Sequence, residues 1–125
     1  DIMVTGSKMP VINYKKTFKE AFKIMNKKKL GIIVITKNKF ITGLITDGDL
    51  RREVNKISAK TNLTNFINKT PMTVNENMPA SKALSIMNEK KITSLLVVSD
   101  KDFNKNKKVL KGIIHIHFLL QNGVG

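Results

Sequence analysis

The pattern of apolar and polar positions along this chain occurs twice. Residues 21–31 (AFKIMNKKKLG) align with residues 83–93 (ALSIMNEKKIT) at an offset of 62 positions, with six identical residues. In each half, apolar side chains recur three and four positions apart, which is the spacing of one helix face. The sequence therefore predicts two amphipathic helices, whose buried faces hold Phe18, Ala21, Phe22 and Met25 in the first and Ala80, Ala83, Leu84 and Met87 in the second.

Particular residues mark where both helices begin. Thr17 and Glu20 stand three positions apart, as the two partners of a capping box do. Pro79 suits a first helical turn, where its missing N–H is not needed. We interpret the methionines on the predicted faces as core residues, because their flexible side chains commonly fill gaps in a core.

An unbroken apolar run follows each predicted helix. The runs GIIVIT (31–36) and SLLVVS (94–99) are short enough for strands buried on both faces. A polar turn comes next, at 37–39 in the first half and at 100–108 in the second, so that the offset rises from 62 to 69. The remaining predicted elements are a second strand at 40–46 and 109–115, an amphipathic helix at 49–57 and 116–124, and a short lead-in strand at 11–13 and 73–75.

Each half therefore has the element order β-α-β-β-α, which predicts a mixed α/β (α+β) fold made of two tandem repeats. We place the first repeat, with its lead-in strand, at residues 1–62 and the second at 63–125. A unit of about 60 residues buries too small a share of its surface to be more than marginally stable alone. We therefore expect the two repeats to pack together as a pseudo-two-fold pair.

Composition narrows the class of protein. The formal net charge is +14, but the lysines are scattered along the chain, with dense runs only at 27–29 and 105–108, so we expect no nucleic-acid partner. No apolar run is long enough to cross a membrane. The absence of cysteine is typical of a cytoplasmic chain, which is the location we expect. Because the chain begins at Asp1, we expect it to be a piece of a longer protein.

The segment GLITDGDLRR (43–52) carries the candidate chemistry, and it contains both arginines among 23 basic residues. A helix that begins at 47–49 would direct free N–H groups toward a bound anion. Thr46 can donate its hydroxyl to a phosphate oxygen, Gly48 allows close approach, and Asp49 can accept two hydrogen bonds from a ribose diol. These residues predict a nucleotide site.

Each of these residues also has a purely structural interpretation. Asp47 and Asp49 can cap the helix, and for Asp47 we favour the cap over ligand contact. Arg51 and Arg52 lie in the first turn, where a cation opposes the helix dipole, and a planar guanidinium suits carboxylate or phosphate. The alternative for both arginines is an ion pair with Glu53, Asp47 or a partner subunit. Gly31 and Ser94, which open the two apolar runs, are further candidates for ligand contact.

The duplicated unit, the segment from Gly43 to Asp49 and the lead-in at 1–6 resemble a tandem pair of cystathionine-β-synthase (CBS) domains over the whole chain. DGDLRR (47–52), KITSLLVV (91–98) and GIIHIHFLL (112–120) further resemble the CBS pair that follows the sugar-isomerase (SIS) domain of bacterial arabinose-5-phosphate isomerases. The CBS resemblance implies Thr46 near phosphate and Asp49 on the ribose. The isomerase resemblance implies a role in carbohydrate metabolism and lipopolysaccharide biosynthesis.

The second half departs from this pattern. His115 and Phe118 occupy the places of Thr46 and Asp49, so we expect no second identical nucleotide site and treat Phe118 as a core residue. His115 and His117 stand two positions apart at the end of the predicted strand, and we expect that they do not both point the same way. Without a third histidine or a cysteine, we expect no metal site. Either histidine could instead line a cleft and contact a sugar or phosphate.

Two functions of different classes remain open. The first is a regulatory module that binds a nucleotide or nucleotide-sugar, such as the cytidine monophosphate adduct of 3-deoxy-octulosonate, and acts on an attached isomerase. The second is a structural dimerisation module without a ligand. We expect no catalytic residue and no required cofactor in this chain, because it lacks a nucleophile-and-base constellation, and we expect a homo-oligomer.

Overall fold

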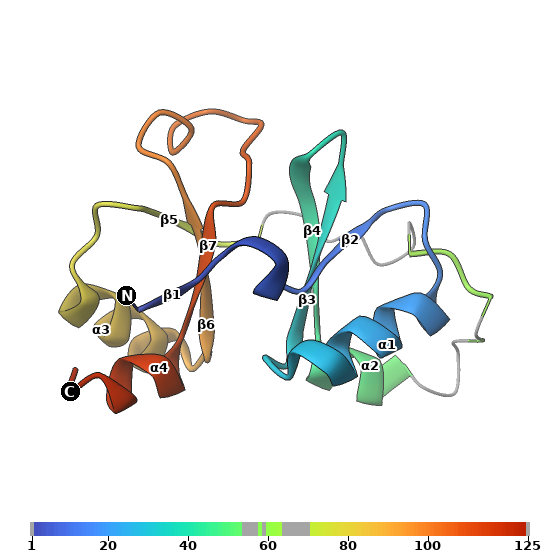
Figure 1. The fold of residues 1–125 in the computed structure, drawn as a ribbon, viewed down its shortest axis with the longest axis horizontal. Helices are drawn as coiled ribbons and strands as arrows, with labels where there is room; N and C mark the ends of the chain where they lie inside the picture. Colours follow the sequence, from blue (N-terminus) through green and yellow to red (C-terminus); the bar gives the residue numbers. More distant parts are fainter. Residues whose placement is uncertain (1, 54–57, 59, 64–70, 125) are drawn as a thin grey trace. The chain divides into compact units, whose positions relative to one another are not determined.

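The computed structural model describes residues 2–53, 58, 60–63 and 71–124, without the Glu53 side chain, and is shown in Figure 1. The chain divides into two compact units, Pro10–Pro71 and a second unit made of Asp1–Met9 with Met72–Gly125. Across the described residues there are two small sheets and four α-helices, so the predicted mixed α/β class is confirmed. Each unit is described by itself below.

The unit Pro10–Pro71 holds a three-stranded sheet in the order β2-β3-β4, formed by Val11–Asn13, Ile32–Lys37 and Phe40–Thr46. The helix α1 (Phe18–Lys28) connects β2 to the parallel strand β3, and α2 (Asp47–Glu53) follows β4 directly. Strands β3 and β4 pair antiparallel through a turn at Asn38 and Lys39, both with positive φ, which is the conformation that tight hairpins favour.

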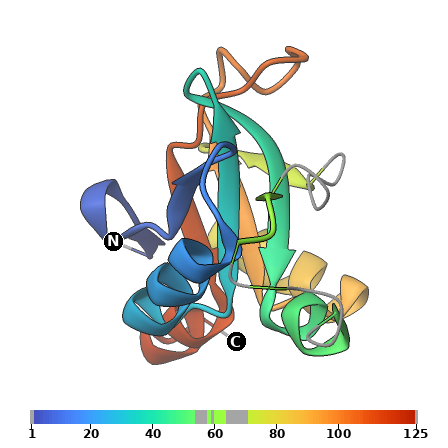
Figure 2. The same cartoon turned by 90° about the vertical axis from the view of Figure 1, so that its right-hand side faces the viewer.

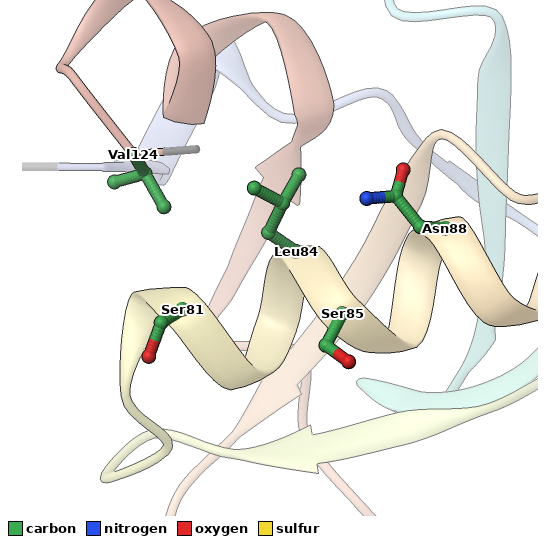
Figure 3. Close-up of a pocket in the computed structure, with 5 residues that line it drawn as sticks. All are labelled: Ser81, Leu84, Ser85, Asn88 and Val124. Atoms are coloured by element: carbon green, nitrogen blue, oxygen red, sulfur yellow. The ribbon is translucent and has the colours of Figure 1, made fainter.

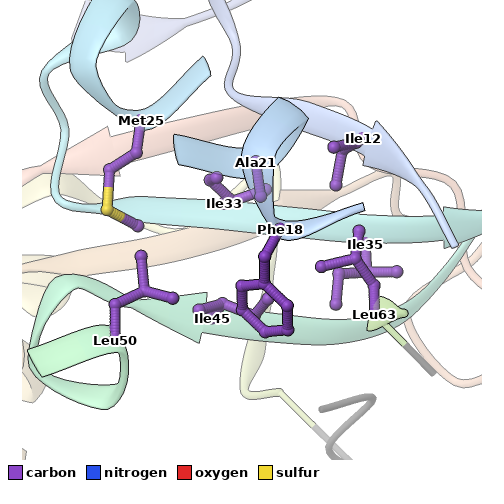
Figure 4. Close-up of a cluster of buried hydrophobic side chains, with 9 residues drawn as sticks. All are labelled: Ile12, Phe18, Ala21, Met25, Ile33, Ile35, Ile45, Leu50 and Leu63. Carbon is purple, nitrogen blue, oxygen red and sulfur yellow. The ribbon is translucent and has the colours of Figure 1, made fainter. Parts of the chain in front are cut away.

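The core of this unit forms where α1 packs on the sheet (Figures 2 and 4). Its buried members are Ile12, Phe18, Ala21, Met25, Ile33, Ile35, Ile45, Leu50 and Leu63. The predicted buried face of α1 is confirmed for three residues but wrong for Phe22, which is 38% exposed. Because each residue turns a helix by about 100°, Phe22 lies at the edge of the face that Phe18, Ala21 and Met25 share.

The second unit holds a four-stranded sheet in the order β1-β7-β6-β5. Its strands are Met3–Val4 (β1), Thr73–Asn75 (β5), Ser94–Val98 (β6) and Gly112–His115 (β7), and its helices are α3 (Ala80–Lys90), α4 (Ile116–Gln121) and a 3₁₀ turn at Gly6–Lys8. β5 lies parallel to β6, whereas β7 lies antiparallel to both β6 and β1. The plan of the first unit is therefore repeated with one added strand.

The added strand β1 explains why the N-terminal residues group with the second unit. Met3 and Val4 pair with Ile114 and Ile113 of β7. The approach is close, because a Cβ placed on Gly112 would lie 2.7 Å from Met3 Sδ. Residues 1–9 are thus attached to the second repeat in space, although they precede the first repeat in sequence.

The two repeats share local details that the aligned residues carry. Both α1 and α3 end on a lysine in the left-handed conformation, Lys29 (φ 59°) and Lys91 (φ 56°). Each lysine donates its backbone N–H to the carbonyl of Met25 or Met87, four residues earlier in the chain. The two aligned KK pairs of the sequence repeat therefore close equivalent helices.

Several predicted boundaries move. The Thr17 side chain forms no cap hydrogen bond, and Pro79 lies just before α3 rather than inside it. α4 ends at Gln121 because Asn122 caps it and Gly123 takes a φ of +80°. β7 begins at Gly112 rather than at residue 109, since the Val109 N–H donates to the Asp102 carboxylate instead. Residues 54–57, the predicted end of α2, lie outside the described residues.

Candidate functional site

Thr46 and Asp49 form a reciprocal capping box at the junction of β4 and α2. The Thr46 N–H donates to Asp49 Oδ2 at 2.9 Å, and the Asp49 N–H donates to Thr46 Oγ1 at 3.0 Å. Both residues therefore act as helix caps. Since the Thr46 hydroxyl accepts this bond, its own proton stays available for donation, and each Asp49 oxygen keeps a further lone pair.

Both arginines pair with the aspartates of the same helix. Arg51 Nη1 donates to Asp47 Oδ2 at 2.7 Å, and Arg52 Nη2 pairs with Asp49 Oδ1. Arg51 thus forms an ion pair with Asp47, which is one of the partners that the sequence suggested for it. The Arg52 pair with Asp49 was missed by sequence reasoning, although its i,i+3 spacing on a helix could have indicated it.

The exposure of these four side chains decides how firmly they are held. Arg51 and Arg52 are 73% and 69% exposed, against 52% for Asp47 and 38% for Asp49. Exposed ion pairs contribute little stability, typically about 0.2–1 kcal/mol. Both guanidinium groups can therefore leave their carboxylates at small cost, and Asp49 is the better shielded of the two acids.

Two glycines complete this group. Gly31 has a φ of +73°, which favours glycine, and its carbonyl accepts from the Asp47 N–H at 2.8 Å. A Cβ on Gly48 would lie 3.5 Å from Arg52 Nη1 and 3.7 Å from Thr46 Oγ1, an ordinary contact distance. The structure therefore brings together the first group of candidates at one end of β3 and β4, namely Gly31, Thr46, Asp47, Gly48, Asp49, Arg51 and Arg52.

The second group of candidates lies at the matching place in the other unit. Ser94 stands opposite His115 in the β6–β7 pair, as Ile32 stands opposite Thr46 in the β3–β4 pair. The rings of His115 and His117 lie 4.8 Å apart at an interplanar angle of 64°. The expectation that they would point apart is therefore wrong. Residues two positions apart already share a face in a strand, and the rings also meet here, where His117 lies in the first turn of α4.

His115 caps α4 with its ring. It is 9% exposed, and its Nδ1 accepts from the His117 N–H at 3.2 Å. Burial and the neighbouring His117 imidazole hold the pKa of His115 below its ordinary value of 6.5. The Ser94 Oγ is buried and has no hydrogen-bond partner within the described part of the chain. This group thus offers a hydroxyl and imidazole nitrogens but no carboxylate.

Phe118 takes the place of Asp49 but does not lie in the core. It is 38% exposed, whereas the adjacent Leu119 is fully buried. The prediction of a core contact for Phe118 is therefore wrong. α4 is short and turns Leu119, not Phe118, toward the cluster that includes Ala83 and Met87.

A shallow pocket of about 370 Å³ in the second unit was not predicted. Figure 3 shows Leu84 pointing from α3 toward Val124, which lies beyond the end of α4. Ser81, Ser85 and Asn88 line the remainder of the pocket. None of these side chains titrates, and the serine and asparagine spacing in α3 is too common in exposed helices to have indicated a pocket.

No cluster of three or more histidine, cysteine or acidic side chains that could hold a metal ion occurs among residues 2–53, 58, 60–63 and 71–124. Over the same ranges, no helix has both the length and the apolar character needed to cross a bilayer.

Comparison with known sequences identifies similar proteins. The CBS domain family model matches residues 1–56 and 63–117. The chain is 38% identical over 126 residues to an uncharacterized protein of Rickettsia prowazekii, and 32% identical over 129 residues to the arabinose 5-phosphate isomerase KdsD of Yersinia pestis. Each alignment covers 99% of this chain but 37% of the relative. The chain thus spans little more than a third of the length of these relatives.

Solved structures have the same fold. Protein MJ1004 from Methanocaldococcus jannaschii matches with a TM-score of 0.78 and 20% identity, over 98% of this chain and 57% of that one. A CBS domain protein from Pyrobaculum aerophilum complexed with AMP matches with a TM-score of 0.71 and 23% identity, over 89% of this chain and 82% of that one. The cytosolic domain of the Mg²⁺ channel MgtE in complex with ATP matches with a TM-score of 0.73 and 14% identity, over 97% of this chain and 46% of that one. At these identities the likeness concerns the fold.

Proposed function

This chain belongs to the CBS domain family, and on that premise we propose that it is a regulatory module whose effector is a ribonucleotide or nucleotide-sugar. The observation that carries the proposal is the Thr46–Asp49 box, which places a free hydroxyl donor beside a partly shielded carboxylate. The AMP and ATP complexes of structural neighbours support a nucleotide as the ligand class.

The chemistry of binding follows from the free valences of these residues. In the proposed complex, the Thr46 hydroxyl donates to a phosphate oxygen of the effector, because its lone pair already serves the Asp49 N–H. Asp49 accepts hydrogen bonds from the ribose hydroxyls through Oδ1, which pairs with Arg52 in this structure. Arg52 moves to an anionic group of the effector, for which its planar donors are suited.

Replacing the Arg52–Asp49 ion pair by a hydrogen bond from ribose to Asp49 is favourable when the two free energies are compared. Releasing an exposed ion pair costs about 0.2–1 kcal/mol. A hydrogen bond between a hydroxyl and a charged carboxylate contributes about 1.5–3 kcal/mol. Arg52 also regains a partner if the ligand carries phosphate or carboxylate. The pairs at α2 therefore favour ligands that bring both a ribose and an anion over nucleosides that bring only the ribose.

The candidate residues of the second unit have a different proposed role from those of the first. Ser94, His115 and His117 would contact a sugar or phosphate group without reading a ribose diol, since no carboxylate lies with them. We keep residues 1–62 and 63–125 as the two family repeats, with β1 contributed to the second repeat in space.

The whole protein is proposed to be a sugar-phosphate isomerase that interconverts ribulose 5-phosphate and arabinose 5-phosphate. The similarity to KdsD supports this, with catalysis assigned to an N-terminal SIS domain and regulation to the present chain. The proposed effector is the cytidine monophosphate adduct of 3-deoxy-octulosonate, a nucleotide that also carries a carboxylate for Arg52. The proposed setting is lipopolysaccharide biosynthesis in the cytoplasm, by a homo-oligomer.

A thermal-shift panel tests the ligand class. AMP, ATP, CMP, the cytidine monophosphate sugar adduct, cytidine and adenosine are each added to the purified chain. A ligand at 100 times its Kd stabilises the folded state by about 2.7 kcal/mol, a rise in Tm on the order of 10 °C. We expect at least one ribonucleotide to raise Tm and the nucleosides to raise it less. If no nucleotide shifts Tm at millimolar concentration, the chain is not a nucleotide module.

The second candidate function, a dimerisation module without a ligand, is favoured by a specific observation. Phe118 and Leu120 on α4 are 38% and 53% exposed, and Phe22 and Met72 are each 38% exposed. Large apolar side chains on a surface commonly mark contact sites. A flat thermal-shift panel together with a stable dimer would favour this function over the first.

A further inference from the structure

The two junctions between the last strand of each repeat and the following helix are capped by different chemistry. At the β4–α2 junction the acceptor for the Asp49 N–H is the Thr46 hydroxyl, which does not titrate near neutral pH. At the matching β7–α4 junction the acceptor for the His117 N–H is the His115 imidazole. The second repeat therefore holds a titratable group at the place where the first holds a hydroxyl.

The cap at His115 requires a neutral ring. An imidazole nitrogen accepts a hydrogen bond only when it carries no proton, so the hydrogen bond to Nδ1 fixes the ring proton on Nε2. Protonation turns Nδ1 into a donor that faces the donor N–H of His117. It also places a positive charge in the first turn of α4, where the helix dipole opposes it.

The described residues packed around His115 supply no charge that would compensate a proton. α4 presents His117, whose ring centre lies 4.8 Å away. β6 presents Ser94, which is not ionisable, and β1 presents Met3 and Val4 to β7. The core members from α3 are the apolar Ala83 and Met87. Among the described groups on these elements, His117 is the one whose charge acts on His115, and it disfavours a proton on that ring.

We propose that the β7–α4 junction is a proton-sensitive cap, in which protonation of His115 releases the first turn of α4. The inference rests on the geometry of His115 and is independent of the nucleotide proposal. It makes the second repeat respond to acidification through a residue that adjoins Ser94 and His117, while the hydroxyl acceptor of the first repeat is unaffected over the same range.

The direction of the pH response follows from proton binding. The unfolded chain takes up a proton at His115 near pH 6.5, whereas the folded protein takes it up at a lower pH. Between these two values the unfolded state binds more protons, so stability falls as pH falls. The ratio of folded to unfolded protein therefore drops by up to about tenfold per pH unit below roughly 6.5, until the folded ring is also protonated.

Urea unfolding of three proteins at pH 7.5 and 5.5 tests this. In His115→Asn, the amide oxygen can still cap α4 but does not titrate. In the control His117→Asn, the cap acceptor stays while the neighbouring imidazole is removed. We expect the parent to lose stability at pH 5.5 and His115→Asn to lose clearly less. His117→Asn should keep part of the loss, because without the neighbouring imidazole the pKa of the folded His115 lies closer to its ordinary value. If His115→Asn shows the same loss as the parent, the cap is not the sensor.

A measurement on the unmodified protein decides the question if His115→Asn does not fold. Nitrogen-15 spectra of the imidazoles follow His115 protonation, while hydrogen exchange follows the His117 amide and the amides of α4. We expect Nδ1 to be unprotonated at pH 7.5, and the protection of these amides to fall in step with its protonation. Protection that persists when His115 is fully protonated would overturn the inference.

Discussion

Asp49 is the residue at which a helix cap and a ligand contact can be separated experimentally. The Asp49→Asn change keeps a side-chain oxygen that can accept the Thr46 N–H, so the capping box survives. The change removes the negative charge that pairs with Arg52 and that would accept the ribose hydroxyls. A cap-only residue and a ligand-binding residue therefore respond differently to the same substitution.

The expected magnitudes follow from exposure and hydrogen bonding. The lost ion pair is exposed, with side chains 69% and 38% accessible, so the free energy of unfolding should fall by only about 0.2–1 kcal/mol. The lost charged hydrogen bond to ribose should weaken binding by about 1.5–3 kcal/mol, which is roughly tenfold to a hundredfold in Kd. The loss of affinity should therefore exceed the loss of stability.

Calorimetric titration with a ribonucleotide and urea unfolding measure the two effects. Glu20→Gln is a matched control, since Glu20 forms an exposed i,i+4 pair with Lys16 in the same unit, at 3.8 Å. It should lower stability by a similarly small amount and leave affinity unchanged. If Asp49→Asn binds every nucleotide as the parent does, Asp49 is only a helix cap. If both variants weaken binding equally, the effect is one of general charge.

Three further predictions test other parts of the interpretation. Phe18→Ala should lower the free energy of unfolding by about 3–5 kcal/mol because Phe18 is fully buried, whereas Phe118→Ala, at 38% exposure, should cost under about 1.5 kcal/mol in the same urea assay. The chain should sediment as a dimer or larger species at high micromolar concentration; a monomer there would contradict the proposal that its exposed apolar side chains form a contact surface between copies. Duplex DNA should bind weakly and dissociate near physiological salt, because the lysines are scattered; salt-resistant, sequence-specific binding would refute this.

The helices and strands could be located from the sequence because the two halves carry the same pattern, so each element predicted in one half is checked against the other. The strand ranges 11–13, 40–46 and 73–75 agree with β2, β4 and β5 as observed. Periodicity also placed α1 and α3, since a helix face needs only the third-and-fourth-position spacing that the aligned blocks share. Helix and strand ends were less certain because they depend on hydrogen bonds such as that from Val109 to Asp102, which no local pattern encodes.

The features that could not be predicted from the sequence depend on which strands and side chains meet in the folded chain. The pairing of β1 with β7 joins residues more than 100 positions apart, and nothing in the pattern of Met3 and Val4 indicates which sheet edge they join. The ring contact between His115 and His117 depends on the side-chain orientations at the junction of β7 and α4, which the sequence pattern does not specify. Gathering of the candidates at 46–52 was predictable, because they are neighbours in sequence, whereas the Arg52 pairing with Asp49 required the structure.

The claim that Asp49 reads a ribose is tested most directly by calorimetric titration of the unmodified chain with CMP and AMP and with their 2′-deoxy forms. If Asp49 accepts the diol, at least one ribonucleotide binds, and its deoxy form, which has lost one charged hydrogen bond, binds about tenfold to a hundredfold more weakly. Equal affinities for the ribo and deoxy forms, or no binding of either, would contradict the proposal.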